Sequence, residues 1–285
     1  AAVLSIIAGD IPGEYYGSAP KASFHLLRSE DSNSELIVEE DNWIAAAEYA
    51  DSVGVDIINT SLGYTRFDDS TQNHTYSDLD GNTTRIAIAS DIAASKGILL
   101  VTSAGNNGES DWEYISSPAD ADSILTIAAV NENGDRGGFS SVGPSSDGDV
   151  KPNIASVGWD TYYISPWSSN IERGSGTSFS APMTTGMVAC LWQGLPGYTN
   201  MEIKQLVEES SNQYNSPDSL IGYGIPNFYE AYRKATGVTY SSPFNKIKDF
   251  YPNPFSKSIT LEINSNNSQV IGITIENYLG QPIRS

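Results

Sequence analysis

The chain has 285 residues, 39% of them hydrophobic, which is enough to bury the core of one large domain beside a small appendage. Its 35 acidic residues outnumber its 15 Lys and Arg residues, for a net charge of −20. This charge argues against binding to nucleic acids or anionic membranes, because both repel an acidic protein. The single Cys190 excludes an internal disulfide, and no run of about 18 apolar residues predicts a membrane span.

Strand and helix patterns alternate up to about residue 235. The expected elements are a strand at residues 22–27, a helix at 41–53, a strand at 55–59, a helix at 84–96 ended by Gly97, and strands at 98–102 and 124–130. The last two strands are continuously apolar, which indicates a parallel sheet buried between helical layers. The pattern predicts a doubly wound α/β fold, whose functional residues follow the carboxyl ends of the strands.

Residues 176–182 form a turn of small residues that leads into an apolar helical pattern at 183–192. A serine at a helix N-terminus lies beside backbone N–H groups without helical partners and beside the positive end of the helix dipole. That environment favours the negative charge of a tetrahedral intermediate. Ser178 is therefore a candidate nucleophile, and a simple N-cap serine is the structural alternative.

This turn, Gly176-Thr177-Ser178-Phe179-Ser180-Ala181-Pro182, resembles the nucleophile motif of the subtilisin-like serine proteases, or subtilases, Gly-Thr-Ser-x-Ala/Ser-x-Pro. Further similar segments follow in the family's order, and the resemblance covers residues 1–237. It implies a subtilisin-like, mostly parallel sheet, and an endopeptidase that forms an acyl-enzyme on Ser178. It also implies that the chemistry needs no cofactor, that structural calcium can bind, and that the protein acts on polypeptides as a monomer.

A candidate oxyanion donor follows the apolar strand at residues 98–102. The side-chain amide of Asn106 can donate to a developing oxyanion together with the backbone N–H of Ser178. The segment Ala104-Gly105-Asn106 resembles the subtilase segment that carries this donor. An ordinary Asn-Gly turn is the alternative.

The resemblance also assigns substrate binding to residues near these groups. The subtilase segment similar to Ser61, Leu62 and Gly63 pairs its backbone with an extended substrate, as an added strand. The opposite wall and an uncharged pocket for an apolar or aromatic side chain are assigned to Ser103, Ala104 and Gly105. Gly176 and Thr177 complete the binding residues.

A serine hydroxyl needs a base to attack at neutral pH, and neither histidine of this chain, His25 or His74, resembles the catalytic histidine of the family. Residues 3–9 resemble the helix that follows that histidine. We therefore expect the catalytic His and Asp to lie upstream of Ala1, and the 285-residue chain to be essentially inactive alone. The alternative is a non-catalytic subtilase-like module that binds peptides or is structural. No Gly-x-Ser-x-Gly elbow of an α/β-hydrolase occurs.

Two smaller features carry weaker signals. Asp78-Leu79-Asp80-Gly81 resembles a fragment of a calcium loop. A solvated acidic loop is the alternative, so the sequence assigns no metal ligands. Cys190 lies among apolar residues of the predicted helix, which favours a buried, unreactive thiol.

The character of the chain changes after Gly237. Residues 238–248 read as a linker, and residues 249–285 as a partial β-sandwich with strands at 258–263 and 270–276. The segment Asp249-Phe250-Tyr251-Pro252-Asn253-Pro254-Phe255 resembles the start of the C-terminal sorting domain of the type IX secretion system. This resemblance implies secretion machinery as a partner and a secreted or cell-surface location. A generic immunoglobulin-like accessory module is the alternative.

Overall fold

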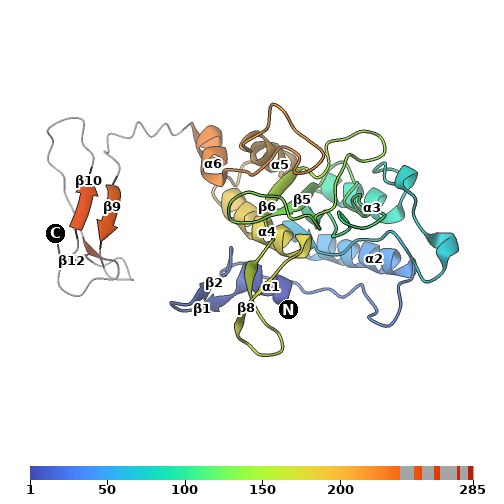
Figure 1. Cartoon of the computed structure of the whole chain (residues 1–285), viewed down its shortest axis with the longest axis horizontal. Coiled ribbons are helices and arrows are strands. Elements are labelled where there is room, and N and C mark those ends of the chain that lie inside the picture. Colours follow the sequence, from blue (N-terminus) through green and yellow to red (C-terminus); the bar gives the residue numbers. More distant parts are fainter. Residues whose placement is uncertain (238–246, 252–259, 264–274, 277–281, 285) are drawn as a thin grey trace. The chain divides into compact units, whose positions relative to one another are not determined.

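The computed structural model describes residues 1–237, 247–251, 260–263, 275–276 and 282–284. These form two units, Ala1–Gly237 and Val238–Ser285. A parallel four-stranded sheet is the centre of the first unit (Figure 1), in the order β3 (Ile57–Thr60), β4 (Leu99–Ser103), β5 (Leu125–Val130) and β6 (Ile154–Val157). All residues of β4 and β5 are buried, as their continuous apolar patterns predicted.

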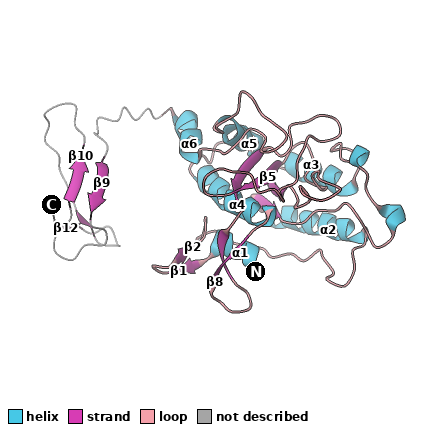
Figure 2. Ribbon diagram, viewed as in Figure 1, coloured by secondary structure: helices cyan, strands magenta, loops and turns pink. Residues whose placement is uncertain are grey.

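Helices cover both faces of this sheet (Figure 2). Helices α2 (Val38–Val53) and α3 (Arg85–Ser95) share one core with β4, formed around Trp43, Ile86 and Leu100. Helices α4 (Thr177–Gln193), α5 (Asn200–Glu209) and α6 (Phe228–Thr236) enclose a second core with Val101 and Ile127. The chain thus has the mostly parallel sheet between helices that its sequence predicted.

Local signals explain where the predicted helices end. The side chain of Thr84 accepts a hydrogen bond from the Ala87 N–H, 3.3 Å away, and so caps the start of α3. After α3, Gly97 takes a φ of 99°, and Gly54 after α2 takes a φ of 75°. Both values lie in the left-handed region that favours glycine, so each glycine lets the chain leave its helix without strain.

Smaller elements surround this framework. Helix α1 (Ala2–Ala8) packs against α4 and against β7 (Thr161–Ile164), which pairs antiparallel with β8 (Ile171–Gly174). Strands β1 (Asp10–Ile11) and β2 (Tyr15–Tyr16) form a short hairpin, and two 3₁₀ turns lie at Ser70–Gln72 and Tyr76–Asp78. None of the helices in the described residues combines the length and apolar composition that a membrane crossing requires.

Two expectations from the sequence are wrong. Residues 22–27 form no strand, and Leu26 is 73% exposed, because an apolar segment becomes a strand only by pairing and no described strand pairs with it. Cys190 is exposed rather than buried. It shares with Met187 the face of α4 opposite the sheet, whereas Val188 and Leu191 supply the buried face.

The second unit is described only in its strands. β9 (Ile247–Tyr251) pairs antiparallel with β10 (Thr260–Ile263), and β11 (Ile275–Glu276) pairs with β12 (Pro282–Arg284). Most of the predicted linker and of the segment that resembles a sorting domain lies outside the described residues. The β-sandwich therefore stays a prediction.

Candidate active site

The first turn of α4 presents Ser178 at the edge of the parallel sheet. Gly176 is the N-cap of the helix and Ser178 its second residue. Ser178 is half-buried, so its side chain is not sealed beneath packed atoms. Within the described residues no hydrogen bond uses the Ser178 N–H, which leaves this donor free at the positive end of the helix dipole.

Ser178 and Asn106 converge on one point beside Gly176. A carbon atom placed at the missing Cβ of Gly176 would lie 3.0 Å from Ser178 Oγ and 3.5 Å from Asn106 Nδ2. The hydroxyl and the side-chain amide therefore border the same space beside Gly176. A residue other than glycine at position 176 would fill that space.

The orientation of Asn106 is set by Thr177. Asn106 Oδ1 accepts hydrogen bonds from the Thr177 N–H at 2.8 Å and from Thr177 Oγ1 at 3.1 Å. Thr177 Oγ1 in turn accepts from the Gly105 N–H at 3.1 Å. Because the amide oxygen is engaged on this side, the amide nitrogen is directed to the other, where it has no hydrogen-bond partner among the described residues. A donor fixed in this way can stabilise a developing oxyanion.

The two segments expected to bind substrate leave neighbouring strands at the same edge of the sheet. Thr60 of β3 lies opposite Thr102 of β4, so the chain following each strand emerges side by side. Within the described residues, no hydrogen bond engages the backbone of Leu62 or Gly63. These free N–H and C=O groups are what an added peptide strand requires.

The opposite segment, at the end of β4, differs in this respect. Ser103 and Ala104 are buried, and Ala104 uses its N–H and C=O in bonds to Ile127 and Ser116. Gly105, half-buried, is the member nearest the surface. Its φ of 109° requires glycine, and an added Cβ would lie only 2.8 Å from Ser141 Oγ. This segment can form a wall, but its backbone offers little to a substrate strand.

Sequence reasoning missed a polar network behind the serine. Thr185 Oγ1 donates to Asn59 Oδ1 at 2.9 Å, and Asn59 Nδ2 donates to Ser61 Oγ at 3.0 Å. Ser61 Oγ completes the chain at 3.5 Å from the carbonyl oxygen of Ser178. The signal was an asparagine at the end of a predicted strand and a threonine inside an apolar helix. Neither residue indicates its partner, because the partner lies on another element.

Neither histidine hydrogen-bonds to Ser178 in the described structure. His25 is exposed, and its ring lies 6.3 Å from that of Tyr49. His74 Nε2 lies 2.5 Å from Glu40 Oε1, and Glu40 is fully buried. Both side chains are therefore placed for roles other than that of a base acting on Ser178.

The carboxylates of the expected calcium loop accept hydrogen bonds within their own turns. Asp78 Oδ2 accepts from the Thr75 N–H at 2.7 Å, and Asp80 Oδ1 accepts from the Asn82 N–H at 2.9 Å. The bonds from Thr75 lower the pKa of Asp78. Burial is the largest single influence on Asp80 and raises its pKa, but the bonds from Asn82 and Thr83 together outweigh it, so the pKa of Asp80 is lowered. The solvated-loop interpretation accounts for both side chains.

Known proteins resemble this chain over about three quarters of its length or more. A thermostable alkaline protease of Halalkalibacterium halodurans is 30% identical over 210 residues, which are 73% of this chain and 50% of that protein. The minor extracellular protease Epr of Bacillus subtilis is 26% identical over 235 residues, 81% of this chain and 32% of that protein. The chain thus spans about half or less of the length of these curated relatives.

Solved structures and a family profile agree with these relatives. The self-cleaved protease domain of PatA superimposes with a TM-score of 0.67 at 25% identity, covering 83% of this chain and 82% of that one. The profile of the subtilase family, Peptidase_S8, matches residues 2–224. Since this match includes both the sheet and the turn at Ser178, the chain belongs to the subtilase family.

Proposed function

We propose that this chain supplies the nucleophile and the oxyanion donors of a serine endopeptidase. The observation that carries the proposal is the convergence of Ser178 Oγ and Asn106 Nδ2 on one point beside Gly176, with the Ser178 N–H unpaired. Leu62 and Gly63 would hold the substrate backbone, and Ser103 to Gly105 would form the opposite wall. Ser61, Gly176 and Thr177 border or position these groups.

The reaction would proceed by acyl transfer. Ser178 Oγ forms a bond to the scissile carbonyl carbon while its proton passes to a base. The carbonyl oxygen becomes negative and accepts hydrogen bonds from Asn106 Nδ2 and the Ser178 N–H. Collapse of this intermediate breaks the C–N bond, the amine leaves with the proton, and water then hydrolyses the ester on Ser178. We propose that the base and its acidic partner come from residues outside these 285, since neither His25 nor His74 hydrogen-bonds to Ser178.

The test uses a polypeptide that carries the native sequence upstream of Ala1. We expect a fluorophosphonate probe to label it, and Ser178→Ala to abolish both labelling and peptide hydrolysis. Asn106→Ala should lower kcat by about 10²–10³-fold, the usual cost of one oxyanion donor. Asn107→Ala is the matched control, because the Asn107 amide donates to Ser116 Oγ instead, at 3.3 Å. Hydrolysis that survives Ser178→Ala would refute the proposal. If the 285-residue chain alone hydrolysed peptides and Ser178→Ala abolished that activity, the proposal that the base lies outside these residues would be wrong.

A second candidate is a subtilase-like module that binds peptides without cleaving them. The free backbone of Leu62 and Gly63, together with the lack of a base bonded to Ser178 in the described residues, favours it. This module predicts that the extended polypeptide binds a peptide but neither reacts with the probe nor hydrolyses its ligand. The peptidase predicts both reactions.

We further propose that the protein acts outside the cell and that residues 249–285 belong to a sorting module read by secretion machinery. The acidic composition supports the location, as does the similarity to the extracellular protease Epr. Strand β10 (Thr260–Ile263) follows the Tyr-Pro-Asn-Pro-Phe segment and lies within the strand expected at residues 258–263. It pairs with β9 (Ile247–Tyr251), which ends at the first residue of that segment. Retention of the protein in cells that express it with its native flanking sequence would contradict this location.

A further inference from the structure

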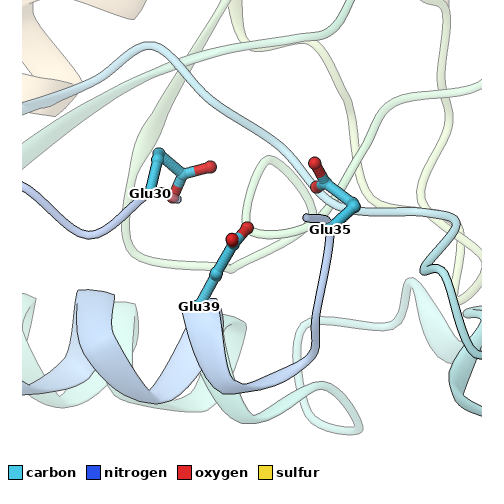
Figure 3. A group of neighbouring side chains, drawn as sticks. All are labelled: Glu30, Glu35 and Glu39. Carbon is cyan, nitrogen blue, oxygen red and sulfur yellow. The ribbon is translucent and has the colours of Figure 1, made fainter. Parts of the chain in front are cut away.

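Three glutamates gather beside the N-terminus of α2. Glu39 is the second residue of the helix, and Glu30 and Glu35 lie in the irregular segment that leads to it. One carboxylate oxygen from each lies within 4.8 Å of the other two. Figure 3 shows the Glu39 side chain rising from the helix toward the space between Glu30 and Glu35. Three carboxylates this close repel one another unless something positive lies between them.

No basic side chain of residues 1–237 neutralises this cluster through an ion pair. A fourth carboxylate adds to the negative charge instead, because Asp68 Oδ2 accepts from the Glu35 N–H at 3.2 Å and the Asp68 N–H donates back to Glu35 O at 2.8 Å. The arrangement is therefore electrostatically unfavourable as the side chains stand.

Glu39 has an oxygen without a partner. Its side chain is almost completely buried, with 2% exposed. Oε1 accepts a hydrogen bond from the Asp31 N–H at 3.1 Å, but Oε2 is buried and has no hydrogen-bond partner. A buried carboxylate oxygen without a partner is costly, and native structures rarely leave one unexplained. This oxygen belongs to the carboxylate that Figure 3 shows facing Glu30 and Glu35.

Glu30 is held in position by a buried phenol. Tyr64 OH donates a hydrogen bond to Glu30 Oε1. Tyr64 is 1% exposed and directly follows Gly63. The cluster is thus tied to α2 through Glu39 and to the end of the Ser61–Gly63 segment through Tyr64.

We propose that Glu30, Glu35 and Glu39 bind a calcium ion, which joins the 30–35 segment to the start of α2. Calcium accepts about six to eight oxygen ligands in irregular geometry, so backbone carbonyls and water can complete the shell. A magnesium ion prefers a regular octahedron and keeps its water, and zinc prefers nitrogen and sulfur ligands, which this cluster lacks. The site is separate from Asp78 and Asp80, and it does not depend on whether the chain hydrolyses peptides.

Calorimetric titration of the 285-residue chain with calcium chloride tests the proposal. We expect saturable binding of one ion per chain at this site, and a melting temperature that rises with calcium concentration. Glu39→Gln keeps the size of the side chain but removes its charge, and should weaken calcium binding by about 100-fold. Terbium offers a second readout, since Tyr64 lies close enough to sensitise its luminescence.

The matched control is Asp122→Asn. Asp122 belongs to a second acidic group, with Asp147 and Asp149, in which all three residues are exposed. This variant should bind calcium as the unchanged chain does. Glu35→Gln, at a half-buried position, gives a second variant if Glu39→Gln fails to fold, as judged by circular dichroism.

Three results would overturn the site: no saturable binding by the unchanged chain, unchanged affinity in Glu39→Gln and Glu35→Gln, or equal loss in Asp122→Asn. A fourth result would also overturn the site: Glu39→Gln raises the melting temperature in calcium-free buffer, and calcium changes the melting temperature of neither protein. A proton shared between the carboxylates, and not a metal, would then occupy the cluster.

Discussion

Replacing Thr177 by valine should destabilise the turn that positions Asn106. Valine has nearly the shape of threonine but lacks the hydroxyl, which accepts from the Gly105 N–H and donates to Asn106 Oδ1, both at 3.1 Å. Thr177 is fully buried, so water does not replace these bonds easily. Losing the bond to Asn106 should cost about 0.5–1.5 kcal/mol, and leaving the Gly105 N–H without an acceptor should cost about 1–3 kcal/mol. We expect the free energy of unfolding to fall by about 2–3 kcal/mol.

Urea unfolding of the 285-residue chain, followed by tryptophan fluorescence, measures this change without requiring activity. Thr177→Ser is the control, because it keeps the hydroxyl and removes one methyl group, at a cost of about 1 kcal/mol. The order of stability should be the unchanged chain, then Thr177→Ser, then Thr177→Val. If valine is tolerated better than serine, packing rather than hydrogen bonding holds this turn, and the account of how Asn106 is oriented is wrong.

Three further predictions concern the framework. Burial lowers the pKa of Lys151 from 10.5 to about 8, so between these pH values the unfolded chain holds a proton that the folded chain has lost. The stability of the unchanged chain relative to Lys151→Met should therefore rise from pH 8 to 10.5 and stay level below pH 8; a fall in that window contradicts the shift. Asn227→Ala removes the cap of α6, whose Oδ1 accepts from the Glu230 N–H at 3.1 Å, and should cost about 1 kcal/mol in a urea titration. Ile127→Ala, at a fully buried position of β5, should cost about 2–5 kcal/mol, whereas Ile92→Ala, 56% exposed on α3, should change stability by about 0.5 kcal/mol or less. Equal effects of these two substitutions would contradict the assignment of the core.

The framework was predictable where one element carries its own signal. Continuous apolar runs at residues 98–102 and 124–130 predicted β4 and β5, because a strand buried on both faces needs no alternation. Gly97 similarly predicted where α3 ends. The segment at 22–27 was also predicted as a strand, but no strand of the described residues pairs with it. Pairing is a tertiary property that composition does not encode. Cys190 failed for a different reason: neighbouring residues of a helix point about 100° apart, so apolar neighbours in the sequence do not place a side chain on the buried face.

The candidate site was predictable only in part. That Asn106 and Ser178 meet follows from topology, since one residue follows a central strand and the other begins a helix at the same edge. The bonds that orient them join residues far apart in the chain, 71 positions between Asn106 and Thr177 and 126 between Asn59 and Thr185. No local pattern specifies such pairs. The three clustered glutamates escaped notice because they lie around an irregular segment, where their spacing has no period.

Pro182 explains why the first turn of α4 depends on these distant bonds. A proline inside a helix has no N–H to give to the carbonyl four residues earlier, which here is that of Ser178. The helix therefore cannot hold Ser178 through its own ladder. Ser61 Oγ is directed at that carbonyl from the end of β3. Asn59 holds Ser61, and Thr185 in the third turn of α4 holds Asn59 in turn. The serine is thus positioned against the strand that leads to Leu62 and Gly63, so the proposed nucleophile and the proposed substrate-binding segment are placed by one set of contacts.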